Sequence, residues 1–84
     1  MSSKYISNKI LLEVKNNIMI RLTLDKALHK RNISRYELAK RTGIQYQIID
    51  NYYKNKVKRY DSYVIDRMCD ALNCTVADII EYKK

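Results

Sequence analysis

The stretch SRYELAKRTGIQYQIIDNYYKN, residues 34–55, determines how this chain can fold. Ser34 is followed three residues later by Glu37, a capping-box spacing that predicts the start of a helix. Gly43 predicts where that helix ends, because glycine adopts the left-handed backbone conformation without steric cost. A further helix is predicted over about residues 45–54. Two short helices joined by a glycine turn make a helix-turn-helix.

Small and apolar side chains occupy fixed offsets within this stretch. Ala39 is placed where the two helices cross, because a larger side chain would force their axes apart. The apolar inner side is expected to consist of Leu38, Ile44, Ile49 and Tyr52. Asn55 stands where a left-handed residue is expected after the second helix, and asparagine is the best choice there after glycine. Asp50 points sideways and would be repelled by a phosphate, so we assign it a structural role.

Capping and periodicity predict further helices on both sides. One runs from Thr23 or Leu24 to Arg31, with Thr23 as its cap and with Leu24, Ala27 and Leu28 facing inward. Another is capped by Asp61 or Ser62 and ends at Asn73, and its inner face carries Ile65, Met68, Cys69 and Leu72. A short last helix starts at the Thr75–Asp78 capping pair, with Val76, Ile79 and Ile80 inward.

The expected fold is therefore all-α, a compact domain of five helices. Between Ile18 and Leu24 every second residue is Ile or Leu, which predicts a short half-buried strand. Ile79, Ile80 and Tyr82 could supply its partner strand. The fold can thus include a minor β-pair between residues 18–24 and 79–83. Residues 1–18 form an N-terminal extension, and the domain proper is expected at 19–84. The apolar patch at residues 10–14 fits one or two helical turns or a short strand.

The basic residues are concentrated in the middle of the chain. Overall, 17 basic residues face 9 acidic ones, a formal net charge of +8. Residues 30–59 hold nine basic and two acidic side chains, whereas residues 60–84 hold three and five. This asymmetry suits a polyanion docked on one face, because neutralised phosphates release condensed counterions. On charge alone, a solvated basic surface is an equally good reading.

Several classes of protein are disfavoured by the sequence. Cys69 and Cys74 do not make a disulfide framework, and we expect reduced, partly buried thiols in a cytoplasmic protein. No apolar run is long enough to span a bilayer, and a signal peptide is not recognisable. Glycine-rich phosphate loops, zinc-ligand spacing and a nucleophile–base pair are all missing, so we expect no enzyme, cofactor, metal or small-molecule ligand. His29 lacks a ligand-spaced partner, which favours a solvent-facing or capping role.

Three motifs give the chain a family resemblance over residues 19–82. They are ELAKRTGI at 37–44, KNKVKR at 54–59 and LNCTVADIIEY at 72–82. With the spacing of Ala39, Gly43 and Ile49, they resemble the Cro and phage-repressor type of helix-turn-helix protein, the Xre-like family of bacteria and their phages. Two positions depart from the family pattern. Tyr53 stands where the family often has Glu, so aromatic packing can replace an internal ion pair, and Asn55 replaces the usual Gly.

The resemblance implies a five-helix DNA binder whose third helix enters the major groove. Carried over by position, it assigns base contacts to Gln45, Tyr46, Gln47 and Asn51. Glutamine and asparagine can pair bidentately with adenine. For Ile48 two roles stay open, which are contact with a thymine methyl group and partial burial. Phosphate contacts are assigned to Ser34, Arg35, Lys54, Lys56, Lys58 and Arg59. These position the protein but carry little sequence information.

The resulting hypothesis is a small transcriptional regulator that binds specific sequences of double-stranded DNA in the cytoplasm, at the nucleoid. Repression by occupying a promoter is the simplest mechanism, with activation through surface contacts as the other. Operators of this family are usually near-palindromic, which implies a homodimer. Two alternatives stay open at this stage: a protein-interaction module of the antitoxin or inhibitor kind on the same fold, and a non-specific nucleic-acid binder.

Overall fold

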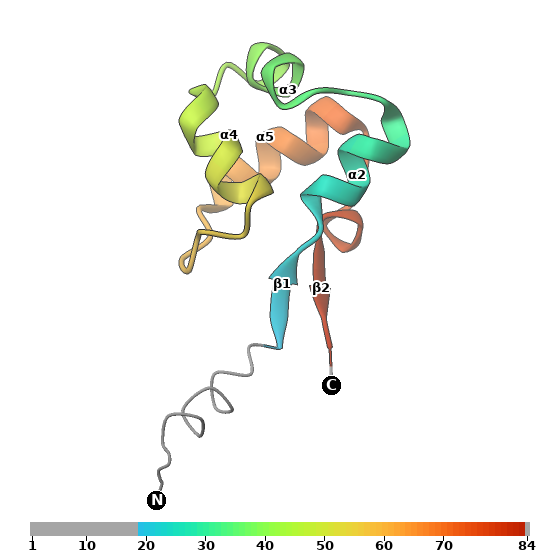
Figure 1. The fold of residues 1–84 in the computed structure, drawn as a ribbon, viewed down its shortest axis with the longest axis vertical. Helices are drawn as coiled ribbons and strands as arrows, with labels where there is room; N and C mark the ends of the chain where they lie inside the picture. The colour runs from blue at the N-terminus through green and yellow to red at the C-terminus, as the bar shows by residue number, and fades with distance from the viewer. Residues whose placement is uncertain (1–18, 84) are drawn as a thin grey trace, which may run out of the picture.

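The helices gather into one body and a pair of strands extends from it. The computed structural model describes residues 19–83, and Figure 1 shows their arrangement. The elements in chain order are β1 (Ile20–Leu22), α2 (Leu24–Arg31), α3 (Arg35–Thr42), α4 (Tyr46–Tyr53), α5 (Ser62–Leu72), the 3-10 turn η1 (Val76–Asp78) and β2 (Ile80–Tyr82). The patch predicted at residues 10–14 lies outside the described residues.

Left-handed residues end the helices, largely where the sequence predicts them. Gly43 has φ 76° after α3, and Asn55 has φ 59° just beyond α4. Asn73 ends α5 at φ 53°, as predicted, and Asn32 ends α2 at φ 56°. Asparagine tolerates this conformation better than other residues with a Cβ, because its short polar side chain can bond locally. The predicted boundaries are thus confirmed to within one or two residues.

The core forms where the inner faces of the helices meet. Leu38, Ile49 and Met68 are fully buried, and Tyr52 is buried with them. The phenol oxygen of Tyr52 accepts a hydrogen bond from the Asp61 backbone N–H at 2.9 Å, which joins the end of α4 to the start of α5. Full burial of one such apolar side chain contributes about 1.5–3 kcal/mol. The predicted inner side, with Leu38, Ile44, Ile49 and Tyr52, is confirmed.

The predicted fifth helix is wrong. The described residues contain four α-helices, and the segment after Asn73 makes only the three-residue turn η1 before entering β2. The Thr75–Asp78 capping box is present. Ile79 closes the turn, and its carbonyl accepts a hydrogen bond from the Thr23 backbone N–H at 2.7 Å, so that the chain enters β2 at Ile80 instead of continuing a helix. Ile79 is buried as predicted, whereas Val76, predicted to face inward, is half exposed.

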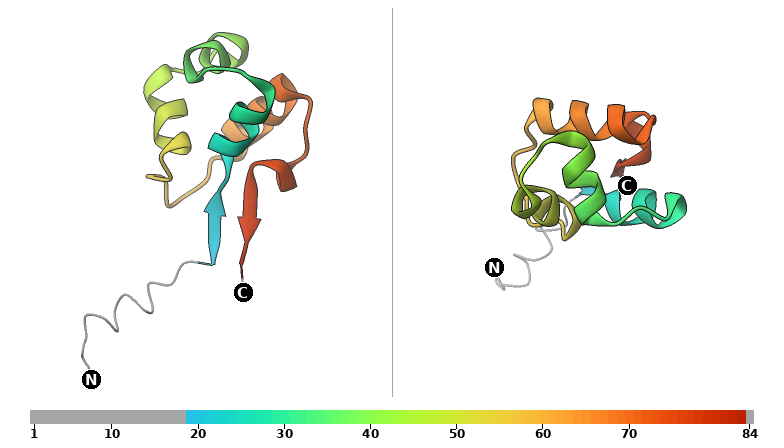
Figure 2. Two further views of the ribbon diagram at one scale, coloured as in Figure 1. Left: turned by 45° about the vertical axis from the view of Figure 1, so that its right-hand side comes forward. Right: turned by 90° about the horizontal axis from the view of Figure 1, so that it is seen from above.

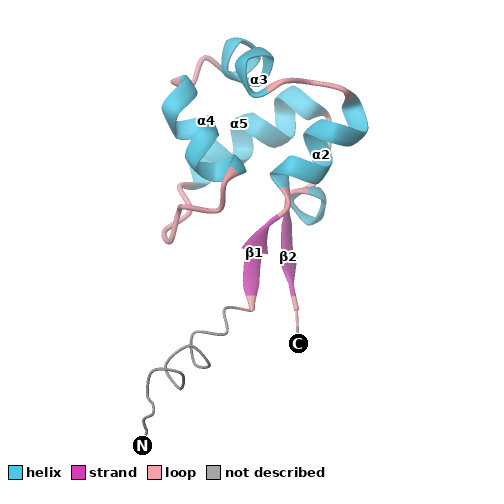
Figure 3. Ribbon diagram, viewed as in Figure 1, coloured by secondary structure: helices cyan, strands magenta, loops and turns pink. Residues whose placement is uncertain are grey.

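The predicted β-pair is confirmed and ties the two ends of the described chain together. Strands β1 and β2 are antiparallel, with Ile20 opposite Tyr82 and Leu22 opposite Ile80. They lie side by side in Figure 1 and in the left view of Figure 2, and they are the only strands of residues 19–83 (Figure 3). Thr23 is the N-cap residue of α2, as predicted, but its hydroxyl makes no capping bond and donates to the Asp78 carbonyl at 3.2 Å instead.

Asn55 connects the end of α4 to β1. Its side-chain amide donates to the Leu22 carbonyl and accepts from the Leu22 N–H, each at 2.8 Å. A carboxamide presents the same donor and acceptor as a peptide group, so this side chain satisfies both backbone groups of Leu22. The asparagine that replaces the usual glycine therefore fixes the position of β1 relative to α4.

Two substitutions of Asn55 separate the contribution of its amide contacts from that of its tolerance for left-handed backbone. We expect Asn55→Gly to lower the free energy of unfolding by about 1 kcal/mol, because the amide contacts are lost while the backbone stays unstrained. Asn55→Ala should cost about 2 kcal/mol, since alanine also strains the left-handed conformation. Urea denaturation of both variants measures the difference. A glycine variant as stable as the wild type would contradict the structural role of the amide.

Candidate nucleic-acid interface

Helix α4 buries one side and exposes the other. Ile49 and Tyr52 are buried. On the opposite side, Gln47 is exposed, Asn51 is partly exposed, and Tyr46 and Ile48 expose 43% and 37% of their surface. Gln45 precedes the helix as its exposed N-cap residue. The structure thus brings all four predicted base-contacting residues to the accessible side of α4, while their contact with bases stays a prediction.

Two amides on that side are linked. The Gln47 Nε2 donates to the Asn51 Oδ1 at 3.1 Å, one helical turn away. The bond does not use the Asn51 amide hydrogens or the Gln47 carbonyl oxygen, and both types of group can bond to base edges. Because the two side chains restrain one another, α4 presents an oriented pair of amides to whatever docks on it.

The turn between α3 and α4 sets the angle at which α4 is held. The Gly43 N–H donates to the Ala39 carbonyl at 2.9 Å. The buried Thr42 hydroxyl donates to the Leu38 carbonyl and accepts from the Ile44 N–H. From α5, Arg67 donates to the Thr42 carbonyl through Nε at 3.1 Å and Nη2 at 2.7 Å.

Sequence reasoning missed both Thr42 and Arg67. A threonine directly before a turn glycine is a signal for local side-chain to backbone bonding and could have indicated Thr42. Arg67 has no comparable signal, because its partner is 25 residues away. The pair shows that α5 contributes to the interface indirectly, by holding the turn.

Asp50 joins the two helices of the motif electrostatically. The carboxylate lies 2.6 Å from the Arg35 Nη1 on α3 and 3.1 Å from the Lys54 Nζ, and its side chain is only 10% exposed. The Arg35 guanidinium also stacks over the ring of Tyr53, 4.4 Å from its centroid, which is a cation–π contact. The structural role predicted for Asp50 and the aromatic packing predicted for Tyr53 agree with these contacts.

Two of the residues predicted to contact phosphate are already paired with Asp50. Arg35 and Lys54 are both engaged with Asp50, although their side chains remain 34% and 47% exposed. The hydrogen bond from Lys54 and then that from Arg35 keep the pKa of Asp50 below its ordinary value, against the opposing effect of desolvation. Asp50 therefore stays ionised at neutral pH and cancels part of the positive charge beside α4.

The other predicted phosphate contacts fall into two groups. Lys56, Lys58 and Arg59 lie in the exposed connection after α4, and within residues 19–83 none of them forms an ion pair. Ser34 caps α3 by accepting from the Glu37 N–H at 3.0 Å, which confirms the predicted helix start. The Glu37 carboxylate bonds Arg41 at 2.9 Å, so it does not complete the capping box at Ser34.

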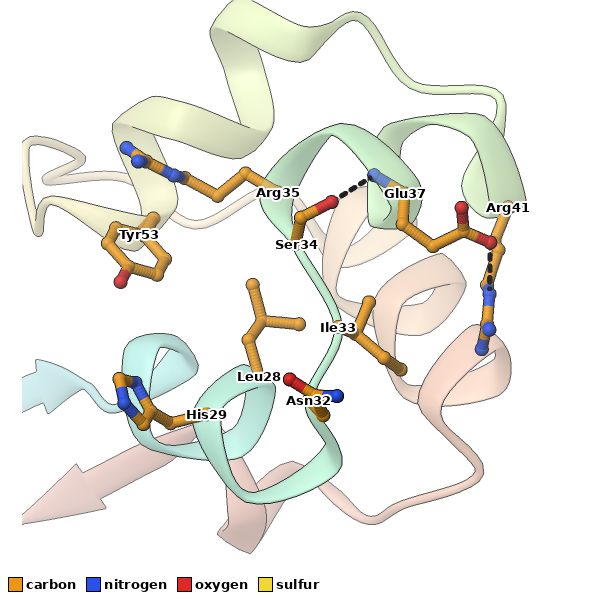
Figure 4. A pocket seen from close by; sticks show the side chains of 9 residues that line it. All are labelled: Leu28, His29, Asn32, Ile33, Ser34, Arg35, Glu37, Arg41 and Tyr53. Carbon is orange, nitrogen blue, oxygen red and sulfur yellow. Dashed lines mark hydrogen bonds and ion pairs between the residues drawn. The ribbon is translucent and has the colours of Figure 1, made fainter.

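A pocket of about 630 Å³ opens between the end of α2 and the start of α3. Its walls include His29, Asn32, Ser34 and Tyr53, and Figure 4 shows Arg35 extending from α3 toward Tyr53. Two arginines and a glutamate share the lining, and the glutamate pairs with Arg41. The mixed and paired charges give this pocket no net preference for an anion.

The remaining chemical groups suggest no further site. Among residues 19–83, no cluster of three metal-binding side chains is found, and none of the helices has the length and hydropathy of a membrane span. His29 is exposed. Cys69 and Cys74 are free and partly buried, as predicted, and burial, followed by the neighbouring Cys74, raises the pKa of the Cys69 thiol to about 11. That thiol is therefore protonated at neutral pH.

The Asp50 contacts predict a specific pH dependence. A carboxylate whose folded-state pKa is lowered stabilises the protein above its unfolded pKa near 4, and this stabilisation is lost as pH falls through the folded value. Asp50→Asn should therefore destabilise the protein at pH 7 and show a smaller loss of stability between pH 5 and pH 2. Urea denaturation across that range measures it, with Asp70→Asn, an exposed carboxylate on α5, as the control. An unchanged pH profile in Asp50→Asn would contradict the assignment.

Comparisons with known proteins agree with this geometry. A family model for the Cro/C1-type HTH DNA-binding domain matches residues 23–84. An uncharacterised HTH-type transcriptional regulator of Bacillus subtilis, YozG, is 33% identical over 62 residues, which are 74% of each chain. The crystal structure of a Bacteroides fragilis protein thought to bind DNA superposes with a TM-score of 0.65 at 17% identity, over 75% of this chain and all of that one, and shows the shared fold. The chain therefore belongs to the Cro/C1-type helix-turn-helix family of DNA-binding domains.

Proposed function

We propose that this protein regulates transcription by binding specific sequences of duplex DNA, with α4 in the major groove. The observation that carries the proposal is the accessible side of α4, where the linked amides of Gln47 and Asn51 stand beside Gln45 and Tyr46. The major groove is wide enough to admit a helix and displays a distinct donor and acceptor pattern for each base pair. The family comparison favours this function over an antitoxin-like or inhibitor-like protein-interaction module.

The base contacts follow from amide chemistry. An asparagine or glutamine side chain can accept from adenine N6 and donate to adenine N7 at once, which is worth about 1–3 kcal/mol of discrimination. The mutual bond of Gln47 and Asn51 uses one hydrogen of the Gln47 Nε2 and one lone pair of the Asn51 Oδ1, so each amide keeps donor and acceptor capacity for a base. Ile48, 37% exposed, is accessible enough to reach a thymine methyl group.

Phosphate contacts would hold α4 in register. Lys56, Lys58 and Arg59 follow α4 directly and are exposed, so they can reach the backbone beside the groove. Ser34 and Arg35 at the start of α3, with Lys54, would contact a neighbouring phosphate. Arg35 has further N–H donors beyond the one that bonds Asp50, so its ion pair leaves it able to bind an anion.

The simplest regulatory mechanism is repression by occupying a promoter. A homodimer fits near-palindromic operators, whose half-sites lie about one helical turn apart. The protein would act as a non-enzymatic regulator in the cytoplasm, where the DNA is. The domain itself is proposed to begin at residue 19, after the extension of residues 1–18.

Selection of bound duplexes from a random-sequence pool tests the proposal directly. Wild-type protein at near-physiological salt should recover a motif of two inverted half-sites. Gln47→Ala should lose preference at one position in each half-site, because one amide pairing is removed. Binding that yields no motif would indicate a non-specific binder, and a Gln47→Ala motif identical to the wild type would contradict the placement of α4.

The phosphate contacts predict a charge-specific effect. Lys56→Ala should weaken binding to all duplexes about equally and should flatten the slope of log K against log salt by about one unit, since one fewer counterion is released. Titrations of a specific and an unrelated duplex between 50 and 200 mM salt measure both effects. Lys26→Ala makes the same charge change on α2 and should leave the slope unchanged. Equal slopes for the Lys56 and Lys26 variants would remove Lys56 from the interface.

A further inference from the structure

The edge of β1 that faces away from β2 offers the backbone of Ile20 for pairing. The Thr23 N–H donates to the Ile79 carbonyl at 2.7 Å. The Lys83 N–H donates to the Met19 carbonyl at the same distance. Alternate residues of an antiparallel strand direct their backbone groups to opposite edges. Because residues 19 and 23 bond on the β2 side, the N–H and the carbonyl of Ile20 point away from β2.

The next residue on this outer edge, Leu22, is already covered. Its N–H and carbonyl both bond to the Asn55 side chain, at 2.8 Å each. Neither backbone group of Ile20 has a hydrogen-bond partner within residues 19–83, and the Ile20 side chain is 46% exposed. An uncovered strand edge is a pairing surface for another extended chain. The fold thus presents one backbone donor and one backbone acceptor at Ile20.

A groove of about 750 Å³ lies along the same side of β1. The bonds from Asn55 to Leu22 place the connection after α4 beside the outer edge of β1, on the side opposite β2 (Figure 1). Apolar and cationic side chains share the lining, and no acidic residue of the described chain belongs to it. Besides Asn55, the lining residues are Ile20, Arg21, Lys56, Val57, Lys58 and Tyr60.

We propose that this groove binds an extended acidic peptide of a partner protein, with one apolar residue of the peptide paired antiparallel to Ile20. That residue would exchange two hydrogen bonds with Ile20, from N–H to carbonyl in each direction. The lining carries three cations and no carboxylate, which makes it complementary to an acidic segment. This inference does not depend on DNA binding.

The alternation of side chains defines the sequence pattern of such a peptide. A residue directly opposite Ile20 has its side chain on the same face of the sheet as the Ile20 side chain, so an apolar residue fits there. Its two neighbours in the peptide point to the other face, which is the face of Arg21. A carboxylate opposite Arg21 can pair with the guanidinium. Alternating acidic and apolar residues therefore match the groove.

Two other occupants fit less well. A second copy of this chain would bring Arg21, Lys56 and Lys58 of both copies together, and like charges repel. A phosphate backbone would neutralise the cations, but it has no N–H donor for the Ile20 carbonyl. A peptide supplies the carboxylates, the apolar side chain and the backbone donor together.

A nuclear magnetic resonance titration of the full chain with the terminally blocked peptide EVEVE tests the proposal. Saturable shifts should centre on the Ile20 amide and on the lining of the groove, and the Ile20 amide should become protected from hydrogen exchange. The charge-reversed peptide KVKVK should cause no saturable shift. Equal binding of the two peptides, or no saturable shift with EVEVE, would overturn the proposal. Inorganic polyphosphate that shifts Ile20 as strongly as EVEVE would assign the groove to polyanions instead.

Methylation of the peptide backbone tests strand pairing separately from charge. Methyl groups on both valine nitrogens remove the N–H groups that face Ile20 in the proposed pairing, so the dissociation constant should rise about fivefold. Methyl groups on the last two glutamate nitrogens remove N–H groups at the opposite edge of the peptide and should change it little. Equal weakening by the two modifications would overturn the pairing with Ile20.

A charge reversal in the protein tests the electrostatic part. Lys58→Glu should raise the dissociation constant of EVEVE about threefold or more, since repulsion replaces an attraction. Lys30→Glu makes the same change at an exposed site in the last turn of α2, outside the groove, and should have little effect because salt at about 0.15 M screens distant charges. Equal affinities of the two variants would contradict the charge complementarity.

Hydrogen exchange of the free protein shows whether the edge is open. The Ile20 amide should exchange at close to the rate of an unprotected amide, whereas the Leu22 amide, held by Asn55, should be protected. Ile20 protection that rises with protein concentration would assign the edge to a second copy. Ile20 protection at every concentration would mean that the edge is already covered in the free protein. Either result would overturn the proposal.

Discussion

The geometry of this domain depends on the turn at Thr42 and Gly43. Gly43 provides the left-handed backbone that reverses the chain, and Thr42 bonds to the backbone on both sides of the turn. Arg67 then fixes the turn to α5 with two donors on one carbonyl oxygen. Because interior packing resists continuous deformation, a turn held in three ways leaves α4 with one orientation relative to the rest of the body. The exposed side of α4 is useful for recognition only under that condition.

The charged groups around α4 divide into cations that are paired with Asp50 and cations that are not. Asp50 is the one acidic residue of α4, and it faces inward, where Arg35 and Lys54 surround it. The cations of the following connection have no such partner among residues 19–83. Positive charge is thus partly neutralised beside the exposed side of α4 and left free farther along the chain. Such a division favours contact with phosphates at the flank over indiscriminate attraction at the centre.

Local patterns predicted much of this structure, and contacts between distant residues account for the rest. Caps and left-handed residues are encoded within a few positions, so the limits of α3, α4 and α5 followed from the sequence. The last helix was wrongly predicted because the Ile79 carbonyl bonds to Thr23, far away in sequence, and the chain enters β2 at Ile80. The Arg67–Thr42 and Asn55–Leu22 contacts likewise join residues that no periodicity connects. The exposed side of α4 was predictable, whereas the ion pair that engages Arg35 was not.

The pairing of β1 with β2 also affects how the protein folds during synthesis. The ribosome makes β1 before any helix of the described chain and makes β2 last. At about 5–20 residues per second, the apolar strand at Ile20–Leu22 waits on the order of seconds for its partner. In the finished fold the Asn55 amide occupies both backbone groups of Leu22, so this part of β1 is not available for pairing with another chain.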